Sequence, residues 1–348
     1  MTIHAIAAWQ RPLRNSHGMA LLIVLSVVSL IVVLTIQFNK NMRQNLVTSG
    51  FAGNTIKLET MARSGINLAM AVLDKDTKEN DYDSHLDSWA LLGQENLSPL
   101  FDEGLLTVDI TDNNGRFQIN SLVQSKSEAQ TDQSPQQANA LELATRNVLR
   151  RLLRNEPFAL EDSEAKTIID SLVDWIDADD GDWEQEFGAE SSYYQALKTP
   201  YPCKNGPIEF IEELLLVKGI TPELFYGTKD HAGLARLLTT QGTDGKININ
   251  TADPLLLQAL HEDLTKQMAD DMLAFREDAN NKEALASTKW VVEVLPSLSG
   301  QNGLKNITVK SSSFTVLAQA RLDSSQKKII ATMQRDSQKT TLLQWKVE

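Results

Sequence analysis

The most strongly patterned part of the chain is an uncharged apolar run near its N-terminus. Residues 19–36 read MALLIVLSVVSLIVVLTI. As a helix, this run rises about 27 Å, close to the roughly 30 Å thickness of a bilayer's hydrocarbon core. It is longer than the core of a cleaved secretory signal, about 7–15 residues, and no small-x-small site ends it. A buried core helix is the alternative, but long uncharged runs near a terminus are usually membranous, so a retained membrane helix is predicted.

The apolar helix is predicted to continue as an amphipathic helix. No proline interrupts residues 13–98. Apolar or small residues recur at steps of three or four, or sums of these, which places them on one helix face. This spacing predicts a single helix from about Met19 to about Leu73, half in lipid and half packed on a soluble domain. The residues of the predicted face are Leu46, Phe51, Leu58, Ala62, Gly65, Ile66, Ala69, Val72 and Leu73.

Alternating apolar and polar positions predict strands at both ends of the soluble part. Residues 105–110 alternate, and a turn signal at residues 112–115 precedes residues 116–120, so a β-hairpin is predicted. Further strands are predicted at residues 306–310, 313–320, 328–333 and 341–345. These strands would complete the sheet that the hairpin begins.

The middle of the chain is predicted to be helical. After a polar, low-complexity segment at residues 124–137, apolar residues recur at helical spacing over residues 141–152 and 165–176. Because this part lies between the hairpin and the last strands, it is predicted to be an insertion into the sheet domain. The predicted fold class is therefore α+β.

Charge and cysteine content argue against nucleic-acid-binding, disulfide-linked and cysteine-rich zinc proteins. The 348 residues include 33 Lys and Arg against 46 Asp and Glu, a net charge of -13, which does not favour binding to phosphate backbones. Cys203 is the only cysteine, which excludes an intramolecular disulfide and a cysteine-rich zinc site. Two basic residues precede the apolar run, Arg11 and Arg14, and two follow it, Lys40 and Arg43. The positive-inside rule therefore favours neither orientation of the predicted membrane helix.

An acidic cluster is the strongest candidate for a metal site. Residues 161–190 hold twelve carboxylates and one basic residue. Calcium takes six to eight oxygen ligands, so closely spaced aspartates in a loop suit it. The spacing is not that of an EF-hand, and a solvated acidic loop is the alternative. The candidate calcium ligands are Asp177, Asp179, Asp180, Asp182, Glu184 and Glu190.

Two segments resemble helix-hairpin-helix units. In residues 216–224, a Lys-Gly pair ends one helix, and Thr221-Pro222 starts the next with an N-cap and a proline at the first helical position. The other opens at residues 246–255 with KININTADPL, similar to the VNINTA opening of DNA-binding units. Its hairpin, residues 260–264, has no glycine and two acidic residues, which would repel phosphate. A helical protein-contact module is therefore the favoured interpretation.

Signatures of catalysis are weak. The five histidines have no H-E-x-x-H spacing, and the chain has no G-x-S-x-G, P-loop or Rossmann glycine pattern. Lys204 could lower the pKa of the neighbouring Cys203 thiol, but nothing else marks a nucleophile. Because these signatures are weak, no enzyme is predicted. The enzymatic alternative, a membrane-anchored hydrolase, would need a cleft that contains carboxylates with perturbed pKa values.

The N-terminus resembles that of the type IV prepilin family. A short basic leader ends in Gly18, and the apolar helix begins at once at Met19. The resemblance implies cleavage between these residues by the prepilin peptidase and N-methylation of Met19. Most members carry a glutamate at the fifth mature position, which neutralises the terminal amine of the neighbouring subunit; here that position is Ile23. A subunit without this costly buried carboxylate needs no subunit above it, which suits the tip of a filament.

Further motifs resemble the minor pseudopilin K family of type II secretion (GspK). The resemblance implies a type IV pilin-like fold, in which a long helix, half transmembrane, packs on an antiparallel sheet. It also implies a large all-α insertion of the SAM-like, helix-hairpin-helix kind. The motifs, in order, are GRFQIN at 115–120, LVDWIDAD at 172–179, GAE at 188–190, YY at 193–194, NGP at 205–207 and ELLLVKGI at 213–220.

The resemblance also implies a domain organisation. A cleaved leader is followed by a transmembrane helix, a pilin-like helix with the first strands, an α-helical insertion and the C-terminal strands of the pilin-like domain. The predicted ranges are, in that order, 1–18, 19–39, 40–123, 124–300 and 301–348.

The function implied is that of a tip subunit of the periplasmic pseudopilus, which helps to export folded proteins across the outer membrane. Implied partners are minor pseudopilins I and J in a tip heterotrimer, other pseudopilins, the prepilin peptidase, and secreted cargo or the outer-membrane channel. Residues 19–36 would contact lipid in the inner membrane, with the soluble part in the periplasm, and no nucleic acid is expected. Structures of this family carry calcium in the helical domain, which favours the calcium interpretation. The alternative is a membrane-anchored helix-hairpin-helix DNA-binding protein of a DNA-uptake system.

Overall fold

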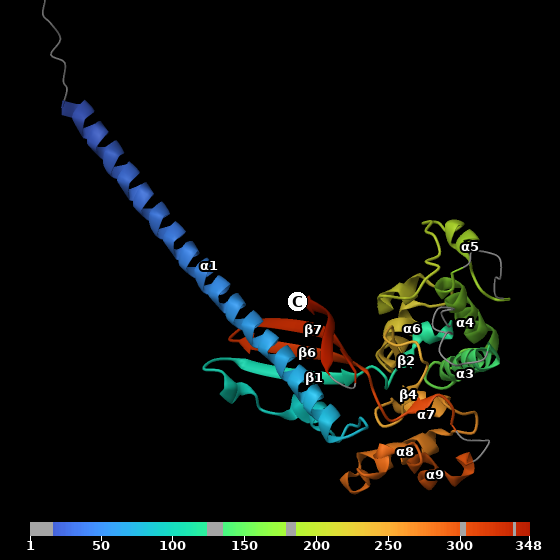
Figure 1. Cartoon of the computed structure of the whole chain (residues 1–348). Coiled ribbons are helices and arrows are strands. Elements are labelled where there is room, and N and C mark those ends of the chain that lie inside the picture. Colours follow the sequence, from blue (N-terminus) through green and yellow to red (C-terminus); the bar gives the residue numbers. More distant parts are fainter. Residues whose placement is uncertain (1–16, 124–134, 179–185, 300–303, 337–338) are drawn as a thin grey trace, which may run out of the picture. The chain divides into compact units, whose positions relative to one another are not determined.

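The computed structural model describes residues 17–123, 135–178, 186–299, 304–336 and 339–348 (Figure 1). The chain divides into two compact units, Met1–Leu58 and Glu59–Glu348. The helices are α1 (His17–Glu79), α2 (Ser88–Leu91), α3 (Pro135–Arg154), α4 (Asp162–Ile176), α5 (Ser191–Gln195), α6 (Pro222–Tyr226), α7 (Pro254–Ala259), α8 (Lys266–Glu277) and α9 (Trp290–Val294). The strands are β1 (Leu105–Asp112), β2 (Phe117–Gln118), β3 (Leu238–Thr239), β4 (Ile247–Asn248), β5 (Ile307–Thr308), β6 (Ser313–Leu322), β7 (Ser325–Arg335) and β8 (Thr340–Val347).

Helix α1 confirms the long helix predicted from the N-terminal pattern, and it ends at Glu79, somewhat later than expected. The side chains of residues 19–36 are exposed throughout, so this run is not a buried core helix. In the second unit, the amphipathic part of α1 buries one face, as its spacing predicts. The buried residues of that face are Met61, Ala62, Ile66, Ala69 and Leu73.

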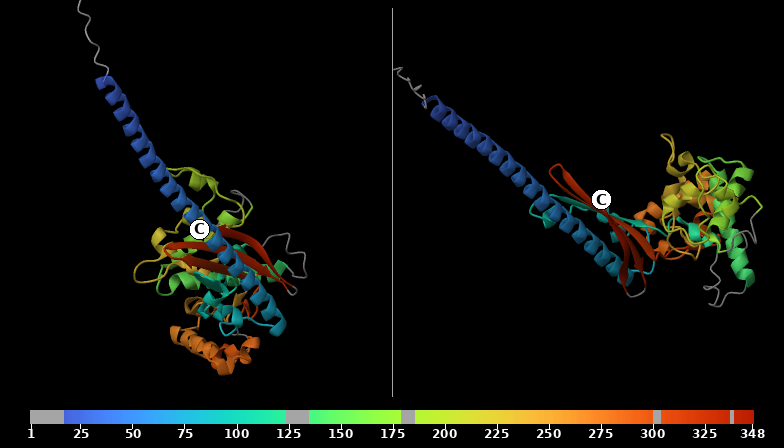
Figure 2. Two further views of the ribbon diagram at one scale, coloured as in Figure 1. Left: turned by 90° about the vertical axis from the view of Figure 1, so that its left-hand side faces the viewer. Right: turned by 90° about the horizontal axis from the view of Figure 1, so that it is seen from above.

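A four-stranded antiparallel sheet forms the partner of this face, in the order β1-β6-β7-β8. Both views in Figure 2 show its strands beside the C-terminal part of α1. At Gly65 the helix comes so close that an added Cβ would lie 2.8 Å from Cγ2 of Val108 in β1. The three strands predicted at residues 313–320, 328–333 and 341–345 are confirmed as β6, β7 and β8.

The predicted β-hairpin is wrong. Strand β1 pairs with β6, and the residues after the turn form β2, which pairs in parallel with β3. The turn signal is a polar junction: Asn113 Nδ2 donates to Ser313 Oγ at 3.0 Å, and the backbone NH of Ser313 donates to Asn114 Oδ1 at 3.1 Å. These long-range bonds hold residues 113–114 at the start of β6, so the chain does not turn back along β1.

The strand predicted at residues 306–310 also lies elsewhere than expected. Its central residues form β5, which pairs in parallel with β4 and is not part of the four-stranded sheet. Both small ladders, β2–β3 and β4–β5, therefore join segments of the helical region to the residues that flank it.

The helical region between β1 and β6 has its own core. The two predicted apolar faces lie on α3 and α4, which pack side by side (Figure 1). Helix α4 begins with a capping box, in which the backbone NH of Glu161 donates to Glu164 Oε2 at 3.0 Å. Its buried residues include Ile168, Leu172 and Trp175. The fold is thus α+β: a long helix on an antiparallel sheet, with a helical region inserted.

Candidate functional site

The first candidate feature is the start of α1, where the predicted processing residues lie. Gly18 and Met19 are in the first turn of the helix, and nothing lies within 4 Å of the position of a Gly18 Cβ. Met19 is exposed, and so is Ile23, the fifth residue if the chain is counted from Met19. By length and composition, the helix from Gly18 is long and apolar enough to cross a membrane. The cleavage itself remains a prediction.

The second candidate feature is the acidic segment that follows α4. Of its six predicted calcium ligands, Asp179, Asp180, Asp182 and Glu184 lie outside the described residues, while Asp177 and Glu190 lie within them.

The last part of this acidic segment returns to α4. The backbone NH of Ala189 donates to Asp174 Oδ2 at 2.8 Å, and that of Phe187 donates to Asp170 Oδ2 at 3.2 Å. Lys218 Nζ donates to the Gly188 carbonyl at 2.8 Å, so an ammonium group of the protein already binds one carbonyl oxygen here.

The donor chemistry of the segment fits a hard cation. Glu190 is buried at 2 % exposure and Asp174 at 0 %, so carboxylates lie inside the protein at its edges. Calcium binds such oxygen ligands. Among the residues that the structure describes, however, no three His, Cys, Asp or Glu side chains are grouped so as to hold a metal ion. The calcium site therefore remains a prediction that involves the four ligands outside the described ranges.

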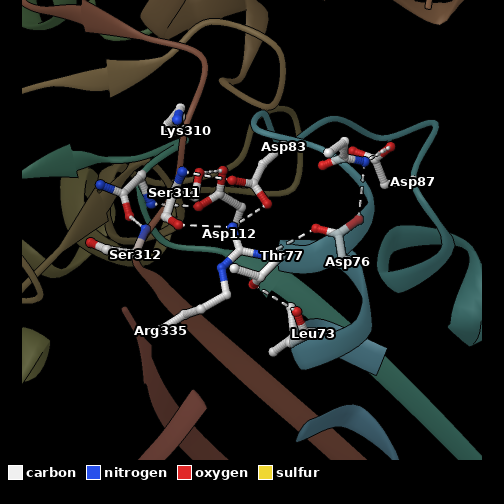
Figure 3. A network of polar contacts seen from close by, with 12 residues as sticks. Leu73, Asp76, Thr77, Asp83, Asp87, Asp112, Lys310, Ser311, Ser312 and Arg335 are labelled. Atoms are coloured by element: carbon white, nitrogen blue, oxygen red, sulfur yellow. Dashed lines mark hydrogen bonds and ion pairs between the residues drawn. The ribbon is translucent and has the colours of Figure 1, made fainter. Parts of the chain in front are cut away.

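A third feature, which the sequence did not reveal, is a buried polar network in the second unit (Figure 3). Its centre is Arg335, the last residue of β7. The guanidinium donates from Nη1 to Asp76 Oδ2 at 3.0 Å and from Nη2 to Asp83 Oδ1 and to the Ser311 carbonyl. It also lies 4.6 Å from the ring centroid of Phe314. One arginine thus joins the end of α1, the loop after it and the sheet.

The carboxylate of Asp112, the last residue of β1, is a second centre of the same network. Its Oδ2 accepts hydrogen bonds from Asn248 Nδ2 at 3.0 Å, Thr251 Oγ1 at 2.5 Å and Ser311 Oγ at 2.6 Å. Its Oδ1 accepts from the backbone NH of Asn114 at 2.8 Å. A buried carboxylate is costly unless its oxygens are satisfied, and here residues from three separate segments satisfy them together.

Burial dominates the electrostatics of this network. It raises the pKa of Asp83 to about 7, although the neighbouring Arg335 acts in the opposite direction. Burial also raises the pKa of Asp76, with Asp87 adding to the effect and Arg335 opposing it. The pKa of Asp112 is raised by burial as well, against the hydrogen bonds that it accepts. The network therefore holds three buried carboxyl groups whose charge is costly, and two of them bond the same guanidinium.

The asparagines of the KININTADPL segment are used inside the protein. Trp290 Nε1 donates to Asn250 Oδ1 at 3.0 Å, and Asn250 Nδ2 donates to the carbonyls of Leu285 and Asp83 at 3.0 and 3.2 Å. Asn248 is held by Asp112 in the network described above. In the part of the chain that the structure describes, these two asparagines therefore belong to a packed junction within the protein, and the protein-contact interpretation stays a prediction.

The lone cysteine has the properties of a buried structural residue. The Cys203 thiol donates to the Asp174 carbonyl at 3.5 Å, and burial raises its pKa to about 11. Lys204 does not activate it, because Lys204 Nζ is bonded to Glu213 Oε2 at 2.7 Å. A thiol of this kind is rarely ionised near neutral pH and is a weak nucleophile.

A single sequence signal for the network was present but was interpreted as a turn. Residues 112–115 combine Asp and Asn in a way typical of turns, yet Asp112, Asn113 and Asn114 are all buried. Their long-range partners are Asn248 and Thr251, more than 130 positions away, and Ser311 and Ser313, about 200 positions away. Local pattern alone does not identify such partners.

Together, these features define a class: an α+β protein in which a long, apolar N-terminal helix packs its later part on an antiparallel sheet and carries a helical region. Two family models described as "Type II secretion system (T2SS), protein K" match residues 115–231 and 247–306. Type II secretion system protein K of Aeromonas hydrophila is 30% identical over 310 residues, covering 86% of this chain and 87% of the relative. The chain belongs to the type II secretion system protein K (GspK) family of minor pseudopilins.

Other relatives agree with this assignment. The protein K of Pseudomonas aeruginosa is 26% identical over 332 residues, covering 92% of this chain and 90% of the relative. Among solved structures, the crystal structure of the GspK-GspI-GspJ complex from the type 2 secretion system of enterotoxigenic Escherichia coli contains a similar chain. The TM-score is 0.60 at 19% identity, with 85% of this chain and 97% of that chain covered, so this match supports the fold.

Proposed function

We propose that this protein is the tip subunit of a periplasmic pseudopilus that helps to export folded proteins across the outer membrane. Membership of the protein K family is the observation that carries the proposal. The similar Escherichia coli chain was crystallised in a complex with GspI and GspJ. By analogy, minor pseudopilins I and J are the proposed partners here, in a heterotrimer that other pseudopilins extend towards the membrane.

The N-terminal sequence supports the position at the tip. The prepilin peptidase would cut between Gly18 and Met19, and Met19 would then be methylated. At the fifth mature position, Ile23 offers no carboxylate to the terminal amine of a subunit above it. A charge at this depth of the bilayer is costly unless it is paired, so its absence suits a subunit with no neighbour above.

The proposal includes the type IV pilin-like fold with its helix-hairpin-helix insertion, and a single-pass location in the inner membrane. The soluble part would lie in the periplasm, where the helical region could contact secreted cargo or the outer-membrane channel. The protein acts by assembly, and the proposal assigns it no reaction. A membrane-anchored DNA-binding protein is less well supported, because Glu262 and Asp263 occupy the hairpin between α7 and α8.

We also propose calcium binding by the acidic segment. Asp177, Glu190 and the carboxylates between them would supply oxygen ligands, and the bound ion would offset their mutual repulsion. In this role the metal is structural and supplies no chemistry. The buried carboxylates at the ends of the segment are the structural observation that agrees with it.

Two measurements test the main proposal. Mass spectrometry of the membrane-extracted protein should give a chain that starts at methylated Met19 only in cells that have the prepilin peptidase. Affinity purification of the full chain, expressed with its own pseudopilins I and J, should recover both in equal amounts. An intact Met1 start in both strains would contradict the processing, and failure to recover either pseudopilin would contradict the tip complex. Salt-sensitive binding of duplex DNA by the purified chain would favour the alternative function.

A further inference from the structure

A pocket lined by three arginines borders the buried polar network at Asp112 and Thr251. It has a volume of about 480 Å³ and is formed by residues of α2, β1, α7 and α8, of the turn between β1 and β2, and of the short helical turn before β3. Arg116, Arg236 and Arg276 line it. Three carboxylates, those of Asp112, Asp253 and Glu277, line the pocket as well, so the arginines without a paired carboxylate decide which ligand it favours.

Arg276 supplies a buried positive charge at this pocket. It is 2 % exposed, and its Nη1 donates to the Ile249 carbonyl at 2.8 Å. Among the described residues its Nε has no hydrogen-bond partner, and the acidic groups that act on its charge are Glu277 and Asp253. Burial lowers the pKa of Arg276 to about 10, so the group is still charged at neutral pH. A buried charge without a counter-ion in contact favours an anion nearby, because the low dielectric of the interior screens it weakly.

Arg116 supplies donors that a ligand can reach. It follows Gly115, whose backbone lies so close to Thr251 that an added Cβ would be 2.6 Å from Thr251 Oγ1. The side chain of Arg116 is only partly buried. That side chain makes no hydrogen bond or ion pair with any residue that the structure describes. Its nearest acidic neighbour, Asp112, already accepts four hydrogen bonds from other groups. The planar guanidinium of Arg116 therefore keeps its donors for another partner.

The remaining charged groups limit the ligand to a small negative charge. Arg236 is paired with Asp253 at 2.8 Å, and the exposed side chain of Glu277 lies at the edge of the pocket. His85 lines the pocket too, and desolvation together with Arg276 lowers its pKa to about 4, so it is neutral near pH 7. Two unpaired guanidiniums next to one exposed carboxylate suit a singly charged carboxylate better than a doubly charged phosphate.

We propose that this pocket binds a carboxylate group, held by Arg116 and attracted by the charge of Arg276. The same chemistry is offered by an acidic side chain on a partner protein and by a free small carboxylate. Trp89, which is 1 % exposed and also lines the pocket, would form its apolar wall.

Calorimetric titration of the full chain in detergent micelles tests the proposal. The probes are an acetylated and amidated Ala-Glu-Ala peptide, its Ala-Gln-Ala counterpart, acetate and inorganic phosphate. The acidic peptide or acetate should bind, and the neutral peptide should not. Preference for the peptide would identify a partner protein as the source of the carboxylate, and preference for acetate would identify a free small molecule. Phosphate binding tighter than both, or no binding of either carboxylate at millimolar concentration, would overturn the proposal.

Variants distinguish binding in this pocket from a general attraction of the anionic probe to positive charge on the protein. Arg116→Gln should weaken binding about tenfold or more, because a charge-assisted hydrogen bond is lost, and Arg116→Lys should weaken it less. Arg321→Gln removes the same charge from an exposed position on β6 and should change binding less than about twofold. Glu277→Gln should strengthen binding. Equal losses in Arg116→Gln and Arg321→Gln would overturn the proposal.

The Arg116 variants should fold normally. The Arg116 side chain forms no hydrogen bond or ion pair within the described part of the chain, so its replacement removes no polar contact of the folded state. Near-ultraviolet circular dichroism of each variant, compared with the wild type, would verify that the fold is kept before binding is measured.

Discussion

Arg335 at the end of β7 donates a hydrogen bond of 3.0 Å to Asp76 in α1, a residue 259 positions earlier in the chain. The same guanidinium bonds Asp83, so it holds two buried carboxyl groups at once. The last strands of the sheet are thereby fastened to the end of the long helix by a charge cluster in addition to the apolar face between them.

Replacement of Arg335 should cost much of the stability of the second unit. Arg335→Met leaves Asp76 and Asp83 buried without their cation, and breaking a buried pair in this way typically costs about 3–5 kcal/mol. Arg335→Lys should restore part of the loss, since it keeps the charge but not the two-sided geometry. Urea unfolding of the chain in detergent, followed by tryptophan fluorescence, measures the difference. The exposed Arg321→Met should lie within about 0.5 kcal/mol of the wild type, and a similar loss in both variants would contradict the prediction.

The stability of the wild type should depend on pH through Asp83. Its pKa is raised to about 7 in the folded state, from an ordinary value near 4, so the folded state holds a proton that the unfolded state has lost. The stabilisation is complete below about pH 4 and is lost as the pH rises through about 7. In Asp83→Asn this contribution is absent. The free energy of unfolding should therefore fall by about 1 kcal/mol or more between pH 4.5 and 7.5 in the wild type relative to the variant.

His85 acts in the opposite direction and makes the comparison with the variant necessary. Its pKa is lowered to about 4, so the unfolded state takes up a proton first as the pH falls below about 6.5, which destabilises the folded state. Because both chains contain His85, its effect cancels in the difference between them. Parallel pH profiles for the wild type and Asp83→Asn would show that Asp83 is ionised throughout this range.

Two glycines of the same helix should respond in opposite ways to alanine. An added Cβ at Gly65 would lie 2.8 Å from Val108 Cγ2 and 3.1 Å from Ala318 Cβ, so the helix or the sheet must shift. Gly65→Ala should therefore destabilise the chain by about 1–3 kcal/mol. Gly53 has nothing within 4 Å, and Gly53→Ala should stabilise the helix by about 0.5–1 kcal/mol. Thermal unfolding followed by circular dichroism would show both changes, and equal effects would contradict the close packing at Gly65.

Removal of calcium should lower the thermal stability of the chain if the acidic segment binds it. A ligand that binds only the folded state at 100 times its Kd contributes about 2.7 kcal/mol. Adding calcium after EDTA treatment should therefore raise the Tm by several degrees, and magnesium should do so less. Glu190→Gln should reduce the calcium-dependent shift, whereas Glu95→Gln, at an exposed site outside the segment, should not. If the Tm of the wild type is the same with and without calcium, the proposed metal site is contradicted.

The sequence predicted those elements whose patterns are local and long. The helix from Met19 onward, the strands β6 to β8 and the faces of α3 and α4 all follow from periodicity over many residues. Family motifs led to the correct family because they are spread along most of the chain. Gly18 and Met19, the residues of the predicted cleavage site, also form a local signal.

The polar network could not be predicted in the same way. Arg335 lies more than 250 positions from Asp76 and Asp83, and each of the three alone looks like an ordinary surface charge. The failed hairpin has the same cause, since Asn113 and Asn114 bond to Ser313 across about 200 positions. Where side chains bond over such separations, tertiary contacts decide which strands pair and local turn propensity does not.

The pairing of β1 with β6 has a consequence for the order in which the protein can form. Asp112 lies opposite Phe314, so the sheet stays incomplete until the ribosome has released almost the whole chain. Until then, the apolar face of α1 around Ala62 and Ile66 lacks the cover of β6 and has only β1 beside it. A nascent chain would keep this face partly exposed until the later strands are made, and exposed apolar surface favours aggregation unless chaperones bind it or folding is fast.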